Sequence, residues 1–198
     1  MPNIGLSKPH YAIYNNNNGA VSYSAGALMA RAVEANVDID AANDNNFYSD
    51  NGISETDRTF AGGTLSFSPD NLTDEVAAAM LGLQTQAITG ITGVTDADAV
   101  EVVYDDDQQT PYLGFGFIVK KRKNGQDLWR AIVLTKIMFS VPSGAYTTQG
   151  ETIDWQVDEL EATIMRDDTA KHTWKREATF TSEDQAEAYI KAKLNIAA

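Results

Sequence analysis

The chain has 198 residues, of which 43% are hydrophobic and 22% are charged, an ordinary balance for one globular domain with a sizeable core. There is no cysteine, which excludes disulfides, thiolate metal sites and cysteine nucleophiles. The net charge of −13 arises in residues 1–119, which contain sixteen acidic and three basic side chains, whereas residues 120–198 contain twelve of each. An acidic surface repels phosphates, so the charge disfavours DNA binding while remaining compatible with DNA that slides past.

The first elements expected are strands, because apolar and polar residues alternate along them. The N-terminus itself, MPNIGLSKPH, has no apolar signal-peptide core, and no apolar run in the chain reaches the length of a bilayer. We therefore expect synthesis in the cytosol. The first two strands are expected over residues 10–14 and 28–39.

Residues 41–63 are a polar stretch of Asn, Asp, Ser, Thr and Gly that also carries Phe47, Tyr48, Ile53 and Phe60. A connection of this length inside a compact domain is uncommon and is usually functional or disordered. The aromatic residues argue against disorder. We interpret the stretch as an extended arm that becomes ordered against another copy of the chain; the alternative is that its four apolar residues pack onto their own domain.

A strand over residues 64–67 and a helix over residues 72–81 follow the arm. The helix has Asp74 and Glu75 in its first turn, where negative charge complements the helix dipole, and Gly82 is a plausible C-terminal stop. A further strand is expected over residues 99–104.

Two long alternating segments, residues 112–119 and 128–141, predict a β-hairpin. They are joined through Asn124 and Gly125, a pair that tolerates the positive φ angles of a type I′ turn. After this hairpin, alternation predicts strands over residues 152–166 and 172–180.

The last part of the chain contains two local signals. Within residues 152–166 the apolar phase shifts from odd to even positions, which predicts a bulge or bend near Asp158 and Glu159. Ser182 and Gln185 have the spacing of a helix capping box. The C-terminal helix that they begin has one apolar stripe, formed by Ala186, Tyr189, Ile190 and Leu194.

These elements predict a mainly β fold, a β-sandwich or partly open barrel of two packed sheets with two flanking α-helices. No internal repeat and no domain boundary is evident, so residues 1–198 are expected to form a single domain.

The sequence contains no motif of a familiar catalytic chemistry, whether a nucleophile elbow, a phosphate-binding loop, a dinucleotide fingerprint or a zinc-protease helix. Its two histidines, His10 and His172, lie in strand-like segments, where a structural role is commoner than a catalytic one. The acidic clusters, Asp105–Asp107 among them, lack the spacing of a calcium loop and are expected to be solvated turns. We therefore expect no enzyme activity, no cofactor and no metal.

The basic run Lys120, Lys121, Arg122 and Lys123 comes at the tip of the expected hairpin. A nucleic-acid role is one interpretation of such a run. An exposed, solvated strand end is the commoner explanation, and docking on an acidic neighbour is the next. A basic tip on an acidic molecule is suitable for self-association.

Three segments carry a resemblance to a known family: NIGLSKPHYAIYNNNNG near the N-terminus, DNNFYSDNG in the arm, and FAGGTLSFSPDNLTDEVAAAMLGL after it. With them, the chain resembles the phage major tail protein family, the tail tube subunits of long-tailed siphophages, over nearly its full length. The resemblance is most distinctive in residues 3–26 and 46–83. It implies a tail-tube-like fold for this chain.

The resemblance also implies a structural role in the virion, where the protein is expected after assembly in the bacterial host cytoplasm. Subunits of this family form hexameric rings that stack into a tube, the conduit for DNA ejection. The implied partners are other copies of the chain, the tape-measure protein and transiting double-stranded DNA in the lumen, and tail-tip and tail-terminator proteins at the ends; no membrane partner is implied. An additional immunoglobulin-like domain of about 100 residues, present in some members, is not expected here.

The expected self-assembly interface combines the arm with the basic hairpin tip. Aromatic residues dominate the energetics of interfaces, which favours this role for the arm. The residues expected in the interface are Phe47, Tyr48, Asn51, Ile53, Glu55, Arg58 and Phe60 of the arm, and Lys120, Lys121, Arg122 and Lys123 of the tip.

Two other functions remain open from the sequence. One is a β-sandwich binding module for host-surface adhesion or carbohydrate, because Asn, Asp and aromatic side chains suit sugars as well as proteins. The other is the tube protein of a contractile tail or a tailocin.

Overall fold

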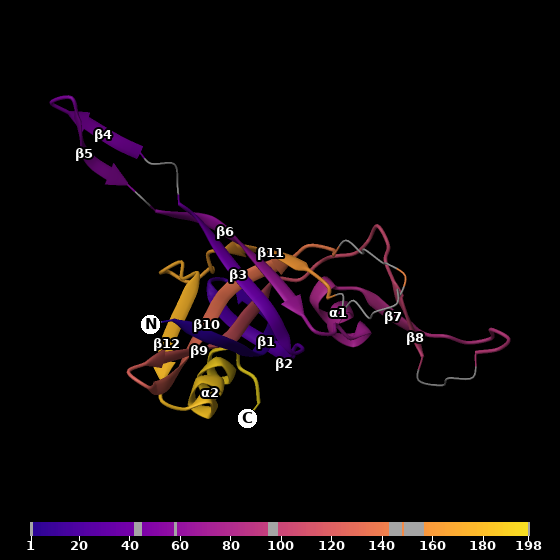
Figure 1. The fold of residues 1–198 in the computed structure, drawn as a ribbon. Coiled ribbons are helices and arrows are strands. Elements are labelled where there is room, and N and C mark those ends of the chain that lie inside the picture. The colour runs from indigo at the N-terminus through magenta and orange to yellow at the C-terminus, as the bar shows by residue number, and fades with distance from the viewer. Residues whose placement is uncertain are drawn as a thin grey trace.

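The computed structural model describes residues 2–41, 45–57, 59–94, 99–142, 148 and 157–197, and the predicted mainly β fold with two flanking helices is confirmed there (Figure 1). The main antiparallel sheet has the strand order β2–β1–β9–β10–β11–β6–β3, and β12 pairs with β10 beside this path. Two small hairpins, β4–β5 and β7–β8, extend from it. In chain order the elements are β1 (Asn3–Asn17), β2 (Ala20–Leu28), β3 (Ala32–Ala41), β4 (Asn45–Ser49), β5 (Gly52–Asp57), β6 (Phe60–Pro69), α1 (Asp74–Leu81), β7 (Gln84–Ala87), β8 (Val100–Val103), β9 (Leu113–Lys123), β10 (Gln126–Phe139), β11 (Leu160–Met165), β12 (Lys175–Phe180) and α2 (Glu183–Lys193).

The predicted central hairpin is confirmed as β9 and β10. Asn124 and Gly125 join the two strands with φ angles of 51° and 81°, as a type I′ turn requires. The first seven residues of β9 are buried, so this strand contributes to cores on both of its faces. Phe115 and Phe117 belong to one core, and Ile118 belongs to the other.

The sheet forks along β10. The segment Trp129–Leu134 pairs with β12, while Lys136–Phe139 pairs with β11 on the way to β6 and β3. The path from β10 through β11 therefore curves over to a second layer, and the larger core lies between this layer and the strands β1, β9 and β10. Its fully buried side chains include Leu65, Phe67, Phe115, Phe139 and Ile164.

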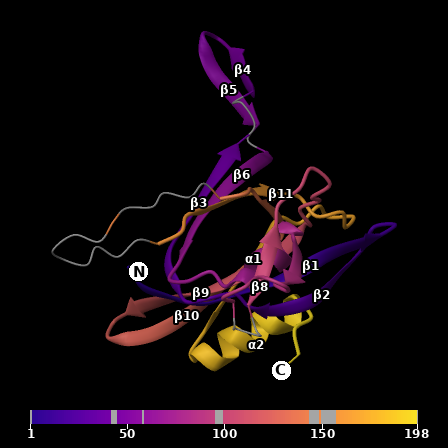
Figure 2. The ribbon, with the colours of Figure 1, turned by 90° about the vertical axis from the view of Figure 1, so that its right-hand side faces the viewer.

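The C-terminal helix covers the outer face of the β1–β9–β10 layer, on the side away from β3 and β6 (Figure 2). Ala186, Ile190 and Leu194 are buried there, as the apolar stripe predicted, and Tyr189 packs beside them. Glycines of β9 allow the close approach: a Cβ at Gly114 would lie 2.6 Å from Leu194, and one at Gly116 would lie 2.7 Å from Ile190. The predicted capping box is not confirmed, because Ser182 makes no side-chain cap hydrogen bond.

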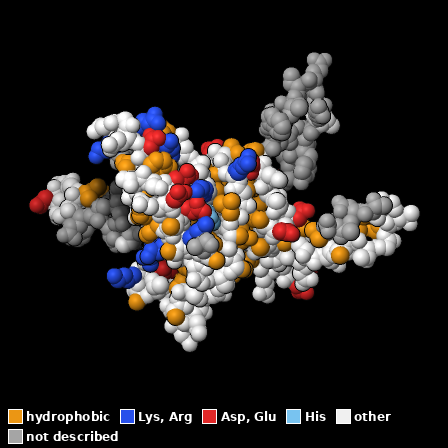
Figure 3. Space-filling model, turned by 90° about the horizontal axis from the view of Figure 1, so that it is seen from below, with side chains coloured by type: hydrophobic (Ala, Val, Ile, Leu, Met, Phe, Trp, Pro, Cys, Tyr) orange, Lys and Arg blue, Asp and Glu red, His pale blue; other side chains and the backbone are white. Residues whose placement is uncertain are grey.

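Ionic contacts also tie α2 to the first strand. Lys8 of β1 pairs with Glu187, and Lys191 lies 2.9 Å from Glu187 one helical turn away. Ser7 donates to Glu183 at 2.6 Å. Figure 3 shows the molecule from the side on which α2 lies, and basic and acidic side chains lie next to one another near the centre of that view.

Several boundaries differ from those predicted. The expected strand over residues 28–39 is wrong as a single element, because β2 ends at Leu28 and β3 begins at Ala32, with buried Met29 in between. Of the expected strand over residues 152–166, the described part contains β11, and residues 157–159 are not in a strand, so the bulge or bend predicted near Asp158 and Glu159 falls before β11; residues 151–156 lie outside the described part. Strands β2, β4, β5 and β7 were not predicted.

The helix predicted after the arm is confirmed as α1, with Asp74 and Glu75 exposed in its first turn and its end fixed by glycine. Gly82 adopts a left-handed conformation with φ of 68°, and its N–H donates to the carbonyl of Ala78. None of the described helices is long and apolar enough to cross a membrane.

Candidate self-assembly site

The predicted arm is a β-hairpin rather than a loop. Strands β3 and β6 pair as far as Ala41 and Phe60, and beyond this point the chain carries β4 and β5 away from the body (Figures 1 and 2). At the tip, Asp50 and Asn51 have φ angles of 50° and 64°, which is the pattern of a two-residue type I′ turn. The hairpin gives the arm a defined shape of its own.

Two apolar residues of the arm are exposed as a cross-strand pair. Tyr48 on β4 is opposite Ile53 on β5, and they are 63% and 59% exposed. Asn51 is exposed at the tip. Phe47 is opposite Glu55 in the same ladder, whereas Arg58 lies outside the described residues. The tip of the predicted interface thus presents an apolar pair on a projecting element.

Phe60, by contrast, packs on its own domain. Its ring stacks on Trp174, with ring centroids 4.5 Å apart and planes inclined by 4°. The guanidinium of Arg166 lies 5.8 Å from the centre of the Phe60 ring and also donates to the Phe60 carbonyl. Phe60 thus follows the alternative of packing on its own domain, and its half-buried ring anchors the base of the arm. A further contact of this residue with another copy stays a prediction.

The basic hairpin tip is partly neutralised within its own strands. Lys120 and Arg122 both contact Asp127 of β10, each at 2.7 Å. Hydrogen bonds from Arg122 and Lys120 lower the pKa of Asp127 to about 2. Burial lowers the pKa of Lys121, and Lys123 is exposed at the end of β9. The tip is exposed as predicted, with less net positive charge than its sequence suggested.

The two histidines lie at separate places in the fold. His10 is buried on β1, where burial lowers its pKa and its Nδ1 lies 2.9 Å from the carbonyl of Lys8. The Nδ1 of His172 lies 3.2 Å from the carbonyl of Asp167. Among the described residues, no three His, Asp or Glu side chains gather as a metal site would require.

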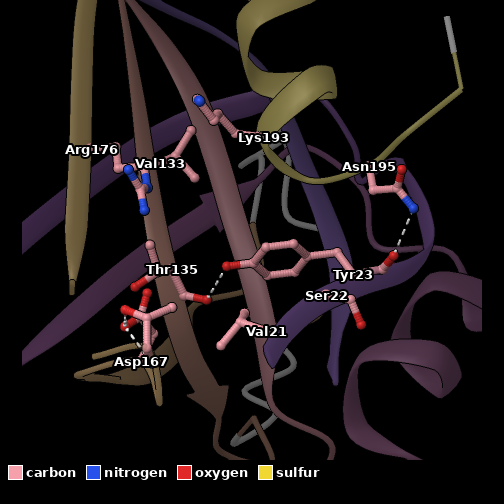
Figure 4. Close-up of a pocket in the computed structure, with 10 residues that line it drawn as sticks. Val21, Ser22, Tyr23, Val133, Thr135, Asp167, Arg176, Lys193 and Asn195 are labelled. Atoms are coloured by element: carbon pink, nitrogen blue, oxygen red, sulfur yellow. Dashed lines mark hydrogen bonds between the residues drawn. The ribbon is translucent and has the colours of Figure 1, made fainter. Parts of the chain in front are cut away.

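A polar cavity of about 480 Å³ lies between β2, β10, β12 and the end of α2 (Figure 4). Tyr23 crosses it and donates from its hydroxyl to the carbonyl of Thr135 at 2.8 Å, while the Asn195 side chain donates to the carbonyl of Tyr23 at 3.0 Å. Burial raises the pKa of Tyr23 well above its usual value of 10. Arg176 and Lys193 also line the cavity. Its residues come from five segments, including Asp167 and Thr169 between β11 and β12, so no sequence motif indicated it.

The sheet ends in strands with one partner each among the described residues. β2 pairs with β1, β3 pairs with β6, and β12 pairs with β10. Glu34, Asp38 and Asp40 are exposed along β3. Strand edges of this kind can pair with another chain unless charge or cover prevents it.

A scan of the chain against protein-family models found no match, and a search of curated proteins found none.

Proposed function

We propose that the chain is a structural subunit that assembles with copies of itself, as the major tail tube protein of a phage with a long tail. The observation that carries the proposal is the projecting β4–β5 hairpin with its exposed Tyr48 and Ile53. Large apolar side chains on a projecting element lose water contact only when a partner covers them, and that burial favours association.

The strands of the sheet support the same proposal. β1, β9 and β10 each exceed ten residues, and the sheet ends in strands that have one partner each in the described part of the chain. Closing a ring of subunits would pair such strands and remove their edges. The excess of acidic over basic side chains suits a tube through which DNA must slide without binding.

Electron microscopy of the purified, concentrated protein tests the proposal. We expect rings or tubes, either spontaneously or after addition of preformed tail tips as an initiator. Deletion of residues 45–58 should leave a folded domain, shown by a cooperative thermal unfolding transition, and should abolish assembly. A protein that stays monomeric at all concentrations and is absent from virions would contradict the proposal, and normal tubes from the deletion variant would contradict the role of the arm.

A binding module is the second candidate, and the cavity around Tyr23 is the observation that favours it. An aromatic ring beside the amide of Asn195 and the cations Arg176 and Lys193 offers both stacking and hydrogen bonding to a polar ligand. Chemical-shift mapping of the monomer against host-surface glycans distinguishes the two functions. Saturable shifts confined to the cavity, without assembly, would favour binding over tube formation.

A further inference from the structure

We infer that a basic and aromatic pocket at the base of the arm binds the acidic turn Asp105–Asp107 of a second copy of the chain. We call it the arm-base pocket; Phe60, Arg166, Lys171, His172, Trp174 and Lys175 line it, and its volume is about 450 Å³. The inference rests on the proposed self-assembly and specifies one contact within it.

The arm-base pocket combines a flat aromatic surface with positive charge. The stacked rings of Phe60 and Trp174 have one cation near each: Arg166 lies 5.8 Å from the first ring centre, and the Lys175 Nζ lies 5.9 Å from the second. Lys171 is exposed at the rim. Lys175 pairs with Glu177 outside the pocket, and no carboxylate is among the described residues that line it. In a chain of net charge −13, this is a local positive site with room for an acidic segment.

The turn Asp105–Asp107 has the opposite character. Its three side chains are exposed, and the backbone N–H of Gln108 donates to the carbonyl of Asp105 at 3.3 Å, which closes the turn. The Gln108 side chain donates to the carbonyl of Leu81 at 3.0 Å, so the turn lies beside the C-terminal end of α1.

The charge at this end of α1 has no basic residue beside it within the helix. A helix C-terminus carries a partial negative charge, and α1 has no basic residue in its last turn. Three adjacent carboxylates in this position repel one another and the helix end, and a cationic partner would relieve that repulsion. The turn therefore favours a positive surface on another molecule.

The two surfaces lie too far apart to meet within one chain. β6 begins at Phe60, in the arm-base pocket, and ends at Pro69, five residues before α1 begins. A strand of this length spans about 30 Å at a rise of about 3.3 Å per residue. Figure 1 shows the arm leaving one end of the sheet and α1 at the other. A contact between the turn of one copy and the pocket of the next joins different surfaces, so it repeats from copy to copy and forms a ring or a stack.

Cysteine cross-linking tests the contact directly, because the chain has no cysteine of its own. Lys171→Cys protein is mixed with Asp106→Cys protein under assembly conditions and oxidised. We expect disulfide-linked dimers at a yield at least tenfold above either variant alone. A mixture of Lys171→Cys with Glu34→Cys, which places the second thiol on the exposed face of β3, is the matched control and should give the background yield.

Charge exchange gives an independent measurement in the full-length protein. Lys171→Glu and Asp106→Lys should each raise the concentration needed for assembly at least tenfold, and the variant with both changes should restore it. If the wild-type protein assembles but the cross-linking yield stays at background, this contact is overturned and the proposed function stays intact. The same conclusion follows if the wild-type protein assembles but the double variant does not. A wild-type protein that never assembles overturns both.

Discussion

The ring of Phe60 lies flat on the ring of Trp174, with 4.5 Å between their centres. This stack joins the first residue of β6 to the segment that leads into β12, two parts of the chain that do not pair in the sheet. It fixes the base from which the β4–β5 hairpin projects.

Phe60→Ala should destabilise the folded protein by about 1–3 kcal/mol, because it removes a half-buried ring and the stacking contact of that ring with Trp174. Urea unfolding followed by the fluorescence of the protein measures the change. Phe60→Tyr, which keeps a ring on Trp174, is the control and should stay within about 0.5 kcal/mol of the wild type. An equal loss in both variants would show that the stack is not the cause.

The exposed pair on the hairpin gives a prediction about assembly without a change in stability. The variant Tyr48→Ser, Ile53→Ser should unfold at the wild-type temperature, since both side chains are mostly exposed, but should need at least tenfold more protein to assemble. Light scattering against concentration measures this. The variant Tyr48→Phe, Ile53→Val retains the apolar area and should assemble normally; if it fails as the serine variant does, apolar burial is not what the pair contributes.

The packing of α2 against β9 requires a glycine at position 116. Gly116→Ala should destabilise the protein by about 1–3 kcal/mol, because its Cβ would lie 2.7 Å from the Ile190 side chain in a packed core. Gly5→Ala on the neighbouring strand would place a Cβ at an ordinary 3.6 Å from Lys120 and should change stability by less than about 0.5 kcal/mol. Thermal unfolding by circular dichroism compares the two, and similar losses would contradict the crowding at Gly116.

Glu187 predicts a loss of stability in acid. Hydrogen bonds from Lys8, and then from Lys191, lower the pKa of this carboxyl to about 2, below the ordinary 4.5 that it has in the unfolded chain. Its stabilisation is fully present above pH 4.5 and is lost as the pH falls towards 2. Glu187→Gln should lower the free energy of unfolding by about 1–2 kcal/mol at pH 6, a modest value because water partly screens the side chain. The loss should be much smaller at pH 2, because Glu187 is then largely protonated in the wild type as well. A difference that does not vary with pH would contradict this account.

Lys136 contacts three groups from distant segments. Its ammonium lies 2.9 Å from Asp168 and 5.1 and 4.6 Å from the ring centres of Tyr14 and Tyr112. Lys136→Met should destabilise the protein by about 1–3 kcal/mol and raise the pKa of Asp168, which the lysine holds below its usual value. Carboxyl titration by nuclear magnetic resonance measures the second effect, and an unshifted Asp168 would exclude the lysine as its cause.

Local signals in the sequence sufficed for the elements whose ends are fixed locally. The Asn124-Gly125 turn specified the β9–β10 hairpin, and Gly82 specified the end of α1. The break between β2 and β3 escaped prediction because its cause is remote. Arg31 exchanges hydrogen bonds with Asp70, thirty-nine residues later, through the Asp70 carboxylate and both backbones.

The sequence predicted only the part of the candidate site that has a local signal. The aromatic residues of the arm marked it as a special segment, and Tyr48 and Ile53 are exposed on it. No signal near Phe60 could indicate Trp174 as its partner, since the two residues meet only after β11 pairs with β6. The cavity around Tyr23 was missed because it is formed by side chains from β2, β10, β12 and α2 together.

The continuity of β3 and β6 with the arm has a mechanical consequence. The hairpin leaves the body along the direction of these two strands (Figure 1), so a pull on its tip acts parallel to the strands. Ladder hydrogen bonds are perpendicular to the strands, and such a pull loads the β6–β11 ladder in shear, with several bonds resisting at once. If the proposed assembly forms, a subunit built in this way would transmit tension to the next copy while its arm stays attached.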